Sequence, residues 1–523
     1  MSAALTPGPS PAGRGEMALA PSPSPEGGGG QTILAIDQST SATKALLFDA
    51  QGRLLDQETR PHQQIYPQPG WVEHDAEEIY RNTLQAAQAL LERAAPRHGR
   101  PAFLSITNQR ETVVVFERST GKPLHHAIVW QCRRGAAVCE QLAAQGHETL
   151  VQARTGLKID TYFSASKLSW LIENRPEIGR MLRDGRALAS TIDAYLIYRL
   201  TGGKVFAGDH TNLSRTLLYN IHTLRWDPEL CELFNVPVQA LPEPRDSSAS
   251  YGATDLEGFL SAPLPIQGVM GDSQAALFGQ RGFQPGAVKI TFGTGSSILL
   301  TLGSLPQPPA QGVVTAVAWV LNGQPTYSYE GITNFTGATL VWLRDQLGLI
   351  ASPEESESLA LAVDGNGGVY LVNAFVGLSA PYWQPQARAA IVGLTPASTK
   401  AHIARAALES TAYLLNDVLR AMSSQAGVQL TSIAADGGGA RNRFLMQFTA
   451  DITRLQVRAS QLPELSALGA ALAGGLGAGL YGSLADLQAL PLAYTPYETQ
   501  MPAAQAAQLT AGWQHALRQT LAP

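Results

Sequence analysis

The chain has 523 residues, of which 45% are hydrophobic and 15% charged, a composition typical of a globular protein that is too long for one hydrophobic core. Two domains of about 250 residues each are the expected division. The formal net charge of −5 provides no general positive field, which argues against nucleic acid or an anionic membrane surface as a partner.

The cysteines and histidines argue against two kinds of site. Cys132, Cys139 and Cys231 are an odd number of cysteines without a CxxC spacing, so neither a disulfide framework nor a zinc site is expected. The ten histidines include the pair His125 and His126, but no spacing places two imidazoles on one helical face. A reducing, cytoplasmic setting is therefore the expected location.

Two stretches differ in composition from the rest of the chain. Residues 1–30 are rich in Pro, Gly and Ser and lack the apolar core of a signal peptide, so they are predicted to form a disordered tail. Residues 465–480 are apolar, but they are shorter than the ~20 residues of a membrane span and contain several glycines. A close-packed helix or helix pair, and no integral membrane segment, is predicted there.

Ordered structure is expected from Gln31 onward. Residues 32–36 form an apolar run typical of a buried strand, residues 37–44 a polar loop, and residues 45–48 a second strand. This pattern predicts a hairpin whose tip carries hydroxyls and backbone amides. A turn and a third strand follow, and then the pattern predicts a helix around residues 75–93, strands around 103–107 and 112–116, and a mostly helical region over 133–200.

A single carboxylate stands between a strand and a helix near the middle of the chain. Residues 266–270 are typical of a buried strand and residues 275–278 of the start of a packed helix, with Gly271 and Asp272 between them. Strand ends beside helix N-termini are common ligand sites in α/β proteins. From this stretch alone, a helix-capping role explains Asp272 equally well.

The opening pattern returns just beyond Asp272. Residues 287–292 predict a strand, residues 293–297 a small hydroxyl-rich loop, and residues 298–301 another strand. Two such units, one near the start of each half, predict two lobes of similar build. A phosphate chain between the two hairpins would meet amides and hydroxyls from both sides, although either loop alone is explained as an ordinary hairpin turn.

A third loop, residues 436–442, contains three consecutive glycines between a short apolar run and a helical pattern. Glycines in this position let a ligand approach the backbone closely. The loop is neither a Walker loop nor a GxGxxG fingerprint, so P-loop and Rossmann mechanisms fit poorly.

Long motifs resemble the FGGY carbohydrate kinases over residues 31 to about 481. Residues 162–174 resemble the first signature of that family, and residues 389–394, followed by 402–409, resemble the second. Further stretches are similar to the glycerol kinases within the family, namely residues 65–75, 106–112, 128–134 and 220–224. The resemblance implies an α/β fold of two actin-like (RNase H-like) ATPase lobes with a cleft between them for MgATP and a polyol.

The resemblance also implies a division of the chain and a set of cofactors. Residues 31–275 would form the N-terminal lobe, which binds polyol and phosphate, and residues 276–523 the C-terminal lobe, which binds the nucleotide. ATP would be the co-substrate and Mg²⁺ the cofactor. A homodimer or homotetramer is the expected assembly, and the sequence does not decide between them.

The resemblance assigns roles to individual residues. Asp272 matches the general base, which accepts the hydroxyl proton during phosphoryl transfer. The acceptor polyol would be bound by Arg110, Glu111, Trp130, Tyr162, Asp272 and Ser273. The nucleotide would be bound by Thr40, Ser41, Ala42, Lys44, Thr294, Gly337, Gly438 and Asn442. Asp37 and Asp272 would approach Mg²⁺, in part through water. Without the motif, Arg110 and Glu111 would be interpreted as a solvated surface pair, and Asp37 as a turn-forming residue.

The match weakens in the acceptor pocket. Ser273 stands where the glycerol kinases have Gln, and Ser297 where they have Phe, so the pocket is expected to be more open and more polar. The loop expected to bind fructose bisphosphate is not matched by residues 256–265.

The sequence therefore predicts ATP-dependent phosphorylation of a terminal polyol hydroxyl, first of glycerol to sn-glycerol 3-phosphate. A kinase for another polyol or a ketose is the alternative. A nucleotide-binding regulator without transfer activity is a third hypothesis, which the combination of Asp37, Arg110, Glu111 and Asp272 disfavours.

Overall fold

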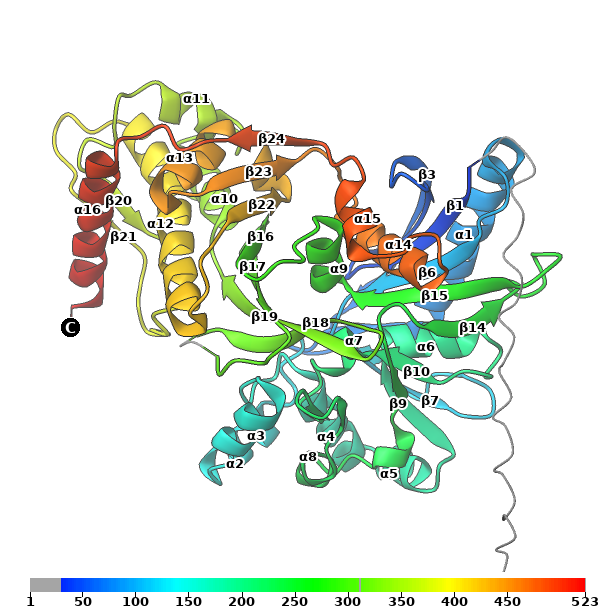
Figure 1. The fold of residues 1–523 in the computed structure, drawn as a ribbon. Helices are drawn as coiled ribbons and strands as arrows, with labels where there is room; N and C mark the ends of the chain where they lie inside the picture. Colours follow the sequence, from blue (N-terminus) through cyan, green and yellow to red (C-terminus); the bar gives the residue numbers. More distant parts are fainter. Residues whose placement is uncertain (1–29, 310–311, 523) are drawn as a thin grey trace, which may run out of the picture.

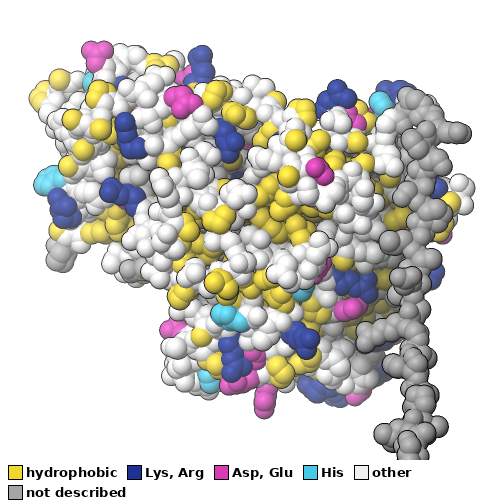
Figure 2. Space-filling model, viewed as in Figure 1, with side chains coloured by type: hydrophobic (Ala, Val, Ile, Leu, Met, Phe, Trp, Pro, Cys, Tyr) yellow, Lys and Arg dark blue, Asp and Glu magenta, His cyan; other side chains and the backbone are white. Residues whose placement is uncertain are grey.

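The structure is a computed structural model that describes residues 30–309 and 312–522. The predicted disordered tail lies, except for Gly30, outside the described residues. In Figure 1 the N-terminal sheet and the C-terminal sheet occupy opposite ends of the molecule, with helices α9 (Asp272–Gly279) and α14 (Leu465–Gly477) between them. Figure 2 shows basic and acidic side chains interspersed on this face, in keeping with the small net charge.

The sheet of the N-terminal lobe has six strands in the order β14-β15-β6-β1-β2-β3. Strand β1 is antiparallel to β2 and parallel to β6, and β6 is parallel to β15. The strands are β1 (Thr32–Gln38), β2 (Ala42–Asp49), β3 (Leu54–Pro61), β6 (Phe103–Asn108), β14 (Ser250–Thr254) and β15 (Leu264–Gly271).

The sheet of the C-terminal lobe has seven strands in the order β18-β19-β17-β16-β22-β23-β24. Strand β16 is antiparallel to β17 and parallel to β22, and β22 is parallel to β23. The strands are β16 (Ala287–Phe292), β17 (Ser296–Gly303), β18 (Val314–Leu321), β19 (Gln324–Thr333), β22 (Ser432–Asp436), β23 (Gln456–Ser460) and β24 (Tyr494–Tyr497).

The two sheets share one topology. The order β3-β2-β1-β6-β15 in the first corresponds to β19-β17-β16-β22-β23 in the second, with the same sequence of antiparallel and parallel pairs. The predicted two lobes of similar build are therefore confirmed. The hairpin loops are shorter than predicted, because the strands continue through residues assigned to them: Asp37 and Lys44 are cross-strand partners, and Ser297 lies within β17.

A smaller five-stranded sheet, in the order β4-β5-β8-β7-β9, and a group of helices extend the N-terminal lobe. Its strands are β4 (Gln64–Ile65), β5 (Glu73–His74), β7 (Val113–Glu117), β8 (Ala127–Ile128) and β9 (Ala187–Thr191). Short strand pairs are β10 (Ala207–Asp209) with β13 (Glu243–Arg245), β11 (Tyr219–Asn220) with β12 (Arg225–Trp226), and β20 (Tyr370–Val372) with β21 (Ala390–Val392).

Helices cover the sheets, and their apolar faces form the cores of the lobes. The first lobe has α1 (Ala76–His98), α2 (Ala136–Ala144), α3 (Glu148–Thr155), α4 (Ser164–Asn174), α5 (Pro176–Arg183), α6 (Ile192–Leu200), α7 (His210–Leu213), α8 (Pro228–Leu233) and the 3₁₀ helix η1 (Val238–Ala240). The second has α10 (Gly337–Asp345), α11 (Glu355–Leu361), α12 (Lys400–Ala426), η2 (Gly438–Arg441), α13 (Arg443–Thr453), α15 (Leu484–Ala489) and α16 (Ala503–Leu521).

Helix α14 is the close-packed helix predicted from residues 465–480. A Cβ atom on Gly469 would lie 1.7 Å from the carbonyl oxygen of Ala275 in α9, and one on Gly474 would lie 2.2 Å from the carbonyl oxygen of Gln267 in β15. Only glycine permits these backbones to approach so closely. Within the described residues, the structure contains no helix both long and apolar enough to cross a membrane.

Candidate active site

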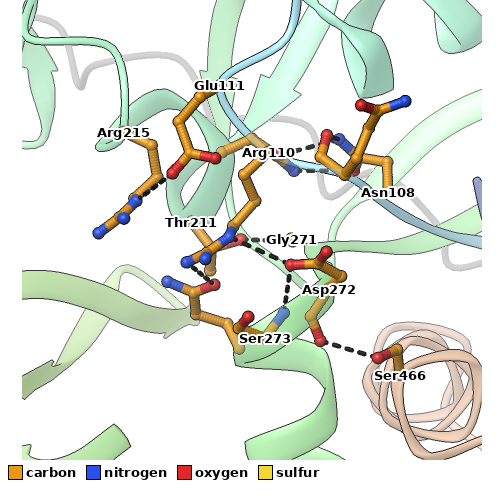
Figure 3. A network of polar contacts seen from close by, with 12 residues as sticks. Asn108, Arg110, Glu111, Thr211, Arg215, Gly271, Asp272, Ser273 and Ser466 are labelled. Carbon is orange, nitrogen blue, oxygen red and sulfur yellow. Dashed lines mark hydrogen bonds and ion pairs between the residues drawn. The ribbon is translucent and has the colours of Figure 1, made fainter. Parts of the chain in front are cut away.

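Asp272 is the first residue of α9, directly after the C-terminal end of β15. The cap position belongs to Gly271, whose N–H donates to Thr211 Oγ1 at 2.7 Å, so the helix-cap interpretation of Asp272 is wrong. The Asp272 side chain is 40% exposed, and its Oδ1 accepts the N–H of Ser273 at 2.6 Å. The Asp272 carbonyl accepts from Ser466 Oγ (Figure 3). These contacts fix a carboxylate that still reaches solvent.

Arg110, just after the C-terminal end of β6, is the cation next to Asp272. Its Nε lies 3.1 Å from Asp272 Oδ1, and its Nη1 and Nη2 donate to the two carboxylate oxygens of Glu330 at 2.8 and 2.9 Å. Nη1 also donates to Gln274 Oε1 at 3.1 Å. Arg110 is 5% exposed and Glu111 1%, so the alternative of a solvated surface pair is wrong.

Glu111 accepts a hydrogen bond from Arg215 Nε at 2.7 Å. Burial raises the pKa of the Glu111 carboxyl, against the opposing charges of Arg110 and Arg215. Its backbone has φ 61°, in the left-handed region that a residue with a Cβ adopts at a cost. Ser164 Oγ holds this turn by donating to the Glu111 carbonyl at 2.9 Å.

Glu330 and Arg215 are site residues that the sequence interpretation missed. Arg215 Nη1 lies 3.0 Å from Glu330 Oε2, and both side chains are 1% exposed. Burial opposes ionisation, but Arg110 and Arg215 lower the pKa of Glu330 to about 2. The sequence signal for Glu330 is a lone carboxylate in strand β19, whose other residues are uncharged, since a carboxylate is rarely buried without a partner.

Trp130 and Tyr162 lie together, as the resemblance implies for an acceptor wall. Their ring centroids are 5.4 Å apart at 63°, and Trp130 Nε1 donates to Thr40 Oγ1 at 3.0 Å. The structure thus brings the predicted acceptor wall against the predicted phosphate loop. Burial raises the pKa of Tyr162 well above its usual range, so its hydroxyl stays protonated.

Lys167, in α4, supports the backbone that carries Tyr162. Its fully buried Nζ donates to the carbonyls of Tyr162 and Phe163, both at 2.9 Å, and to that of Thr161. Burial lowers the pKa of Lys167 to about 8. Lys167 lies within residues 162–174, which resemble the first family signature, but the resemblance implies no role for it.

Arg110 pairs with residues that line two different cavities, Asp272 in one and Glu330 in the other. The larger, of about 950 Å³, is lined by Asp272 and Ser273 together with Lys289, Asp436 and Gly438. The smaller, of about 220 Å³, is lined by Lys158, Asp160, Tyr162, Phe163, Arg215, Gly312, Val314, Glu330, Ile332, Asn334, Ser379 and Trp383. Of the predicted acceptor residues, Asp272 and Ser273 line the larger cavity and Tyr162 the smaller, whereas Arg110, Glu111 and Trp130 line neither.

The first hairpin carries Asp37 and Lys44 on adjacent strands. Lys44 Nζ is paired with Glu464 at 2.8 Å, so its charge is engaged by a carboxylate at the start of α14. Burial raises the pKa of Asp37 to about 7; Lys44 opposes this shift, whereas Asp272 and Glu464 add to it. Thr40 and Ser41 form the short connection, and Ala42 begins β2.

The remaining predicted nucleotide residues surround the second hairpin. Thr294 is exposed in the loop between β16 and β17, and the Gly337 N–H donates to the Gly293 carbonyl at 3.0 Å. Gly337 and Asn442 line a small cavity of about 30 Å³, whereas Gly438 lines the large one. Asn442 also caps α13 by accepting the Leu445 N–H at 2.9 Å.

The described residues contain no cluster of three or more side chains suited to hold a metal on their own. Asp37 and Asp272 nevertheless interact electrostatically, since the charge of Asp272 raises the pKa of Asp37. Two mutually repelling carboxylates fit Mg²⁺, which prefers a few carboxylate oxygens and takes its other ligands from water and phosphate.

Comparison with known proteins accounts for most of the chain. Residues 32–279 match the N-terminal domain of the FGGY family of carbohydrate kinases, and residues 288–478 match its C-terminal domain. The chain is 46% identical to glycerol kinase 1 of Thermotoga maritima over 489 residues, which cover 94% of this chain and 99% of that protein. It is also 46% identical to a glycerol kinase of Stenotrophomonas maltophilia, with 94% and 98% covered.

Solved structures agree with this assignment. The crystal structure of Plasmodium falciparum glycerol kinase with ADP has a TM-score of 0.90 and 34% identity, covering 94% of this chain and 99% of that one. A xylulose kinase of Rhodospirillum rubrum, at 23% identity and a TM-score of 0.83, shares the fold. With the duplicated sheets and both family domains in place, the chain belongs to the FGGY family of carbohydrate kinases, with the actin-like ATPase fold.

Proposed function

We propose that the protein transfers the γ-phosphoryl group of ATP to a terminal hydroxyl of glycerol, giving sn-glycerol 3-phosphate. The observation that carries the proposal is Asp272, a partly exposed carboxylate held at a strand end by Arg110 and the Ser273 N–H. The relatives with 46% and 34% identity that bear the name glycerol kinase support the choice of acceptor.

The chemistry required of the protein is limited. Asp272 accepts the proton of the attacking hydroxyl, while the attacking oxygen is held in line with the phosphorus atom. Arg110 and Glu111 offer a donor and an acceptor for neighbouring hydroxyls, so an acceptor that lacks a hydroxyl would lose a charge-assisted hydrogen bond. Trp130 and Tyr162 form the wall against the carbon chain.

Arg110 and Glu111 would bind the acceptor while keeping their present partners. In the structure their charges are taken by Glu330 and Arg215, so an acceptor hydroxyl shares these contacts. Such a site binds a polyol better than an apolar alcohol of equal size, because hydroxyls form hydrogen bonds with charged groups that an apolar surface would only desolvate.

The nucleotide would lie along the large cavity and the second hairpin. Thr40, Ser41, Ala42 and Lys44 from one lobe, and Thr294 from the other, would contact phosphate oxygens, with Gly337, Gly438 and Asn442 around the base and ribose. Mg²⁺ held near Asp37 and Asp272 would neutralise phosphate charge. This assignment gives residues 31–275 the polyol and phosphate sites and residues 276–523 the nucleotide site. The three cysteines are free and buried, as suits the cytoplasmic location that we propose.

A kinase for a longer polyol or a ketose is the second candidate, because of Ser297. Its Oγ is buried without a hydrogen-bond partner among the described residues, and its cross-strand neighbour Ile332 lines the 220 Å³ cavity. A substrate hydroxyl would satisfy that oxygen. ADP release with three- to five-carbon polyols and ketoses decides between the candidates: glycerol is expected to give the highest kcat/KM, and a clear preference for a longer acceptor would overturn the glycerol assignment.

A further inference from the structure

Glu330 connects the two lobes through the acceptor site. It lies on β19 of the C-terminal lobe, whereas Arg110, Glu111 and Arg215 belong to the N-terminal lobe. Its Oε1 accepts from Arg110 Nη2 at 2.9 Å, and its Oε2 from Arg110 Nη1 at 2.8 Å, with Arg215 Nη1 3.0 Å from Oε2. One buried carboxylate thus joins both guanidinium groups.

The pairing determines which atoms of Arg110 reach Asp272. Because Glu330 takes both Nη atoms, only Nε is directed at Asp272 Oδ1, at 3.1 Å. A guanidinium released from Glu330 would be free to form a two-pronged pair with Asp272, which would occupy both oxygens of the proposed base. Without Glu330, Arg215 would retain only one paired carboxylate, that of Glu111.

We propose that Glu330 is a positioning residue for acceptor binding and transfer: it holds Arg110 and Arg215 in the arrangement that leaves Asp272 and Glu111 able to meet hydroxyls. Since it comes from the opposite lobe, the acceptor site is complete only when the lobes are placed as in this structure. This inference rests on the proposed function. It adds that Glu330 couples closure of the lobes to binding of the acceptor.

A purely stabilising role is the competing explanation. Buried ion pairs are weak evidence for stability, because desolvation offsets much of the attraction between the charges. Glu409 offers a matched control: its carboxylate is also 1% exposed and pairs with Arg405 at 2.8 Å, but both residues lie on α12 within one lobe. Replacing Glu330 or Glu409 with Gln disturbs a buried ion pair in each case, but only Glu330 contacts Arg110.

The kinetic test compares Glu330→Gln, Glu330→Asp and Glu409→Gln in the full chain. We expect Glu330→Gln to raise the KM for glycerol about tenfold and to lower kcat about tenfold, with the KM for ATP within about twofold of wild type. Glu330→Asp keeps the charge and is expected to recover part of the loss. Glu409→Gln is expected to lower the melting temperature without changing the KM for glycerol. A kcat/KM for Glu330→Gln within about threefold of wild type, or an equal rise in both KM values, would overturn the inference.

A second measurement does not depend on turnover. Hydrogen exchange is followed in peptides that contain residues 109–112 and 212–216, in wild type and in both glutamine variants. We expect faster exchange in these peptides for Glu330→Gln and not for Glu409→Gln; unchanged exchange for Glu330→Gln would overturn the positioning role. If wild type phosphorylates no polyol, the proposed function fails, and the exchange comparison still decides the role of Glu330.

Discussion

Arg110 Nε and Asp272 Oδ1 are 3.1 Å apart, and each residue follows the C-terminal end of a strand, β6 for Arg110 and β15 for Asp272. These strands are parallel neighbours, and Gly271 is the register partner of Asn108. The pairing of two adjacent strand ends therefore places the cation beside the carboxylate. It also leaves Asp272 40% exposed, which a base that meets a substrate requires.

Replacement of the Asp272 carboxylate should stop the reaction but preserve nucleotide binding. Asp272→Asn keeps the shape but cannot accept a proton, so we expect kcat to fall about 10³-fold, within the range of general-base contributions. Nucleotide binding measured by calorimetry should weaken only modestly. Near-normal ADP release by this variant would refute the assignment of Asp272 as the base.

Lys44 is expected to act on ATP once phosphate competes with Glu464 for its ammonium group. Lys44→Met should raise the KM for ATP about tenfold and leave the KM for glycerol unchanged, because the charge-assisted contact is lost. Arg53→Met removes an exposed ion pair with Asp49 at 2.7 Å and serves as the control, with no kinetic change expected. Equal ATP KM values for Lys44→Met and wild type would remove Lys44 from the phosphate site.

Magnesium dependence should report on Asp37. Its pKa is raised to about 7, so the ionised carboxylate that binds Mg²⁺ forms as the pH rises through 7. In wild type, we expect the Mg²⁺ concentration for half-maximal activity to decrease as the pH rises from 6 to 8. Asp37→Asn should need about tenfold more Mg²⁺ and lose this pH dependence, while Asp49→Asn should behave as wild type. An unaltered Mg²⁺ requirement in Asp37→Asn would contradict the assignment.

Acid should destabilise the fold through His74. Burial, with the neighbouring His62, lowers the pKa of His74 from 6.5 to about 3, so the unfolded chain binds the proton first as the pH falls. The stabilisation is complete above pH 6.5 and is lost progressively below it, by about 2 kcal/mol between pH 7 and pH 5. Urea unfolding at pH 7 and at pH 5 should show that the free energy of unfolding decreases less in His74→Gln than in wild type. An equal decrease in variant and wild type would show that His74 is not the cause.

Ser297 should influence acceptor length. Ser297→Phe adds a ring beside Ile332, so we expect kcat/KM for five-carbon polyols to fall about tenfold relative to glycerol. Ser297→Ala removes the hydroxyl without adding volume and separates the effect of polarity from that of size. If Ser297→Phe leaves the ratio of kcat/KM for five-carbon polyols to kcat/KM for glycerol unchanged, residue 297 does not face the acceptor.

Much of the architecture was predictable because its signals are local. The apolar runs at residues 32–36 and 287–292, each followed by a short loop that contains Ser and Thr, predicted the two hairpins that begin the duplicated sheets. The glycines of residues 465–480 predicted a closely packed helix, and α14 is packed in that way. Strand and turn preferences depend on a few neighbouring residues, so they can be predicted from a single sequence.

The partners of the charged residues were decided by the tertiary structure alone. Arg110 and Glu330 are 220 residues apart in sequence, and Glu111 and Arg215 are 104 apart. No local preference specifies which carboxylate meets which guanidinium, since that depends on the strands that face each other once both lobes have folded. Burial then makes the pairing obligatory, because an unpaired charge there would be costly. The sequence by itself thus determined the two lobes, the family and the candidate base, whereas the folded chain decided how Asp272 is held and that Glu330 and Arg215 belong to its site.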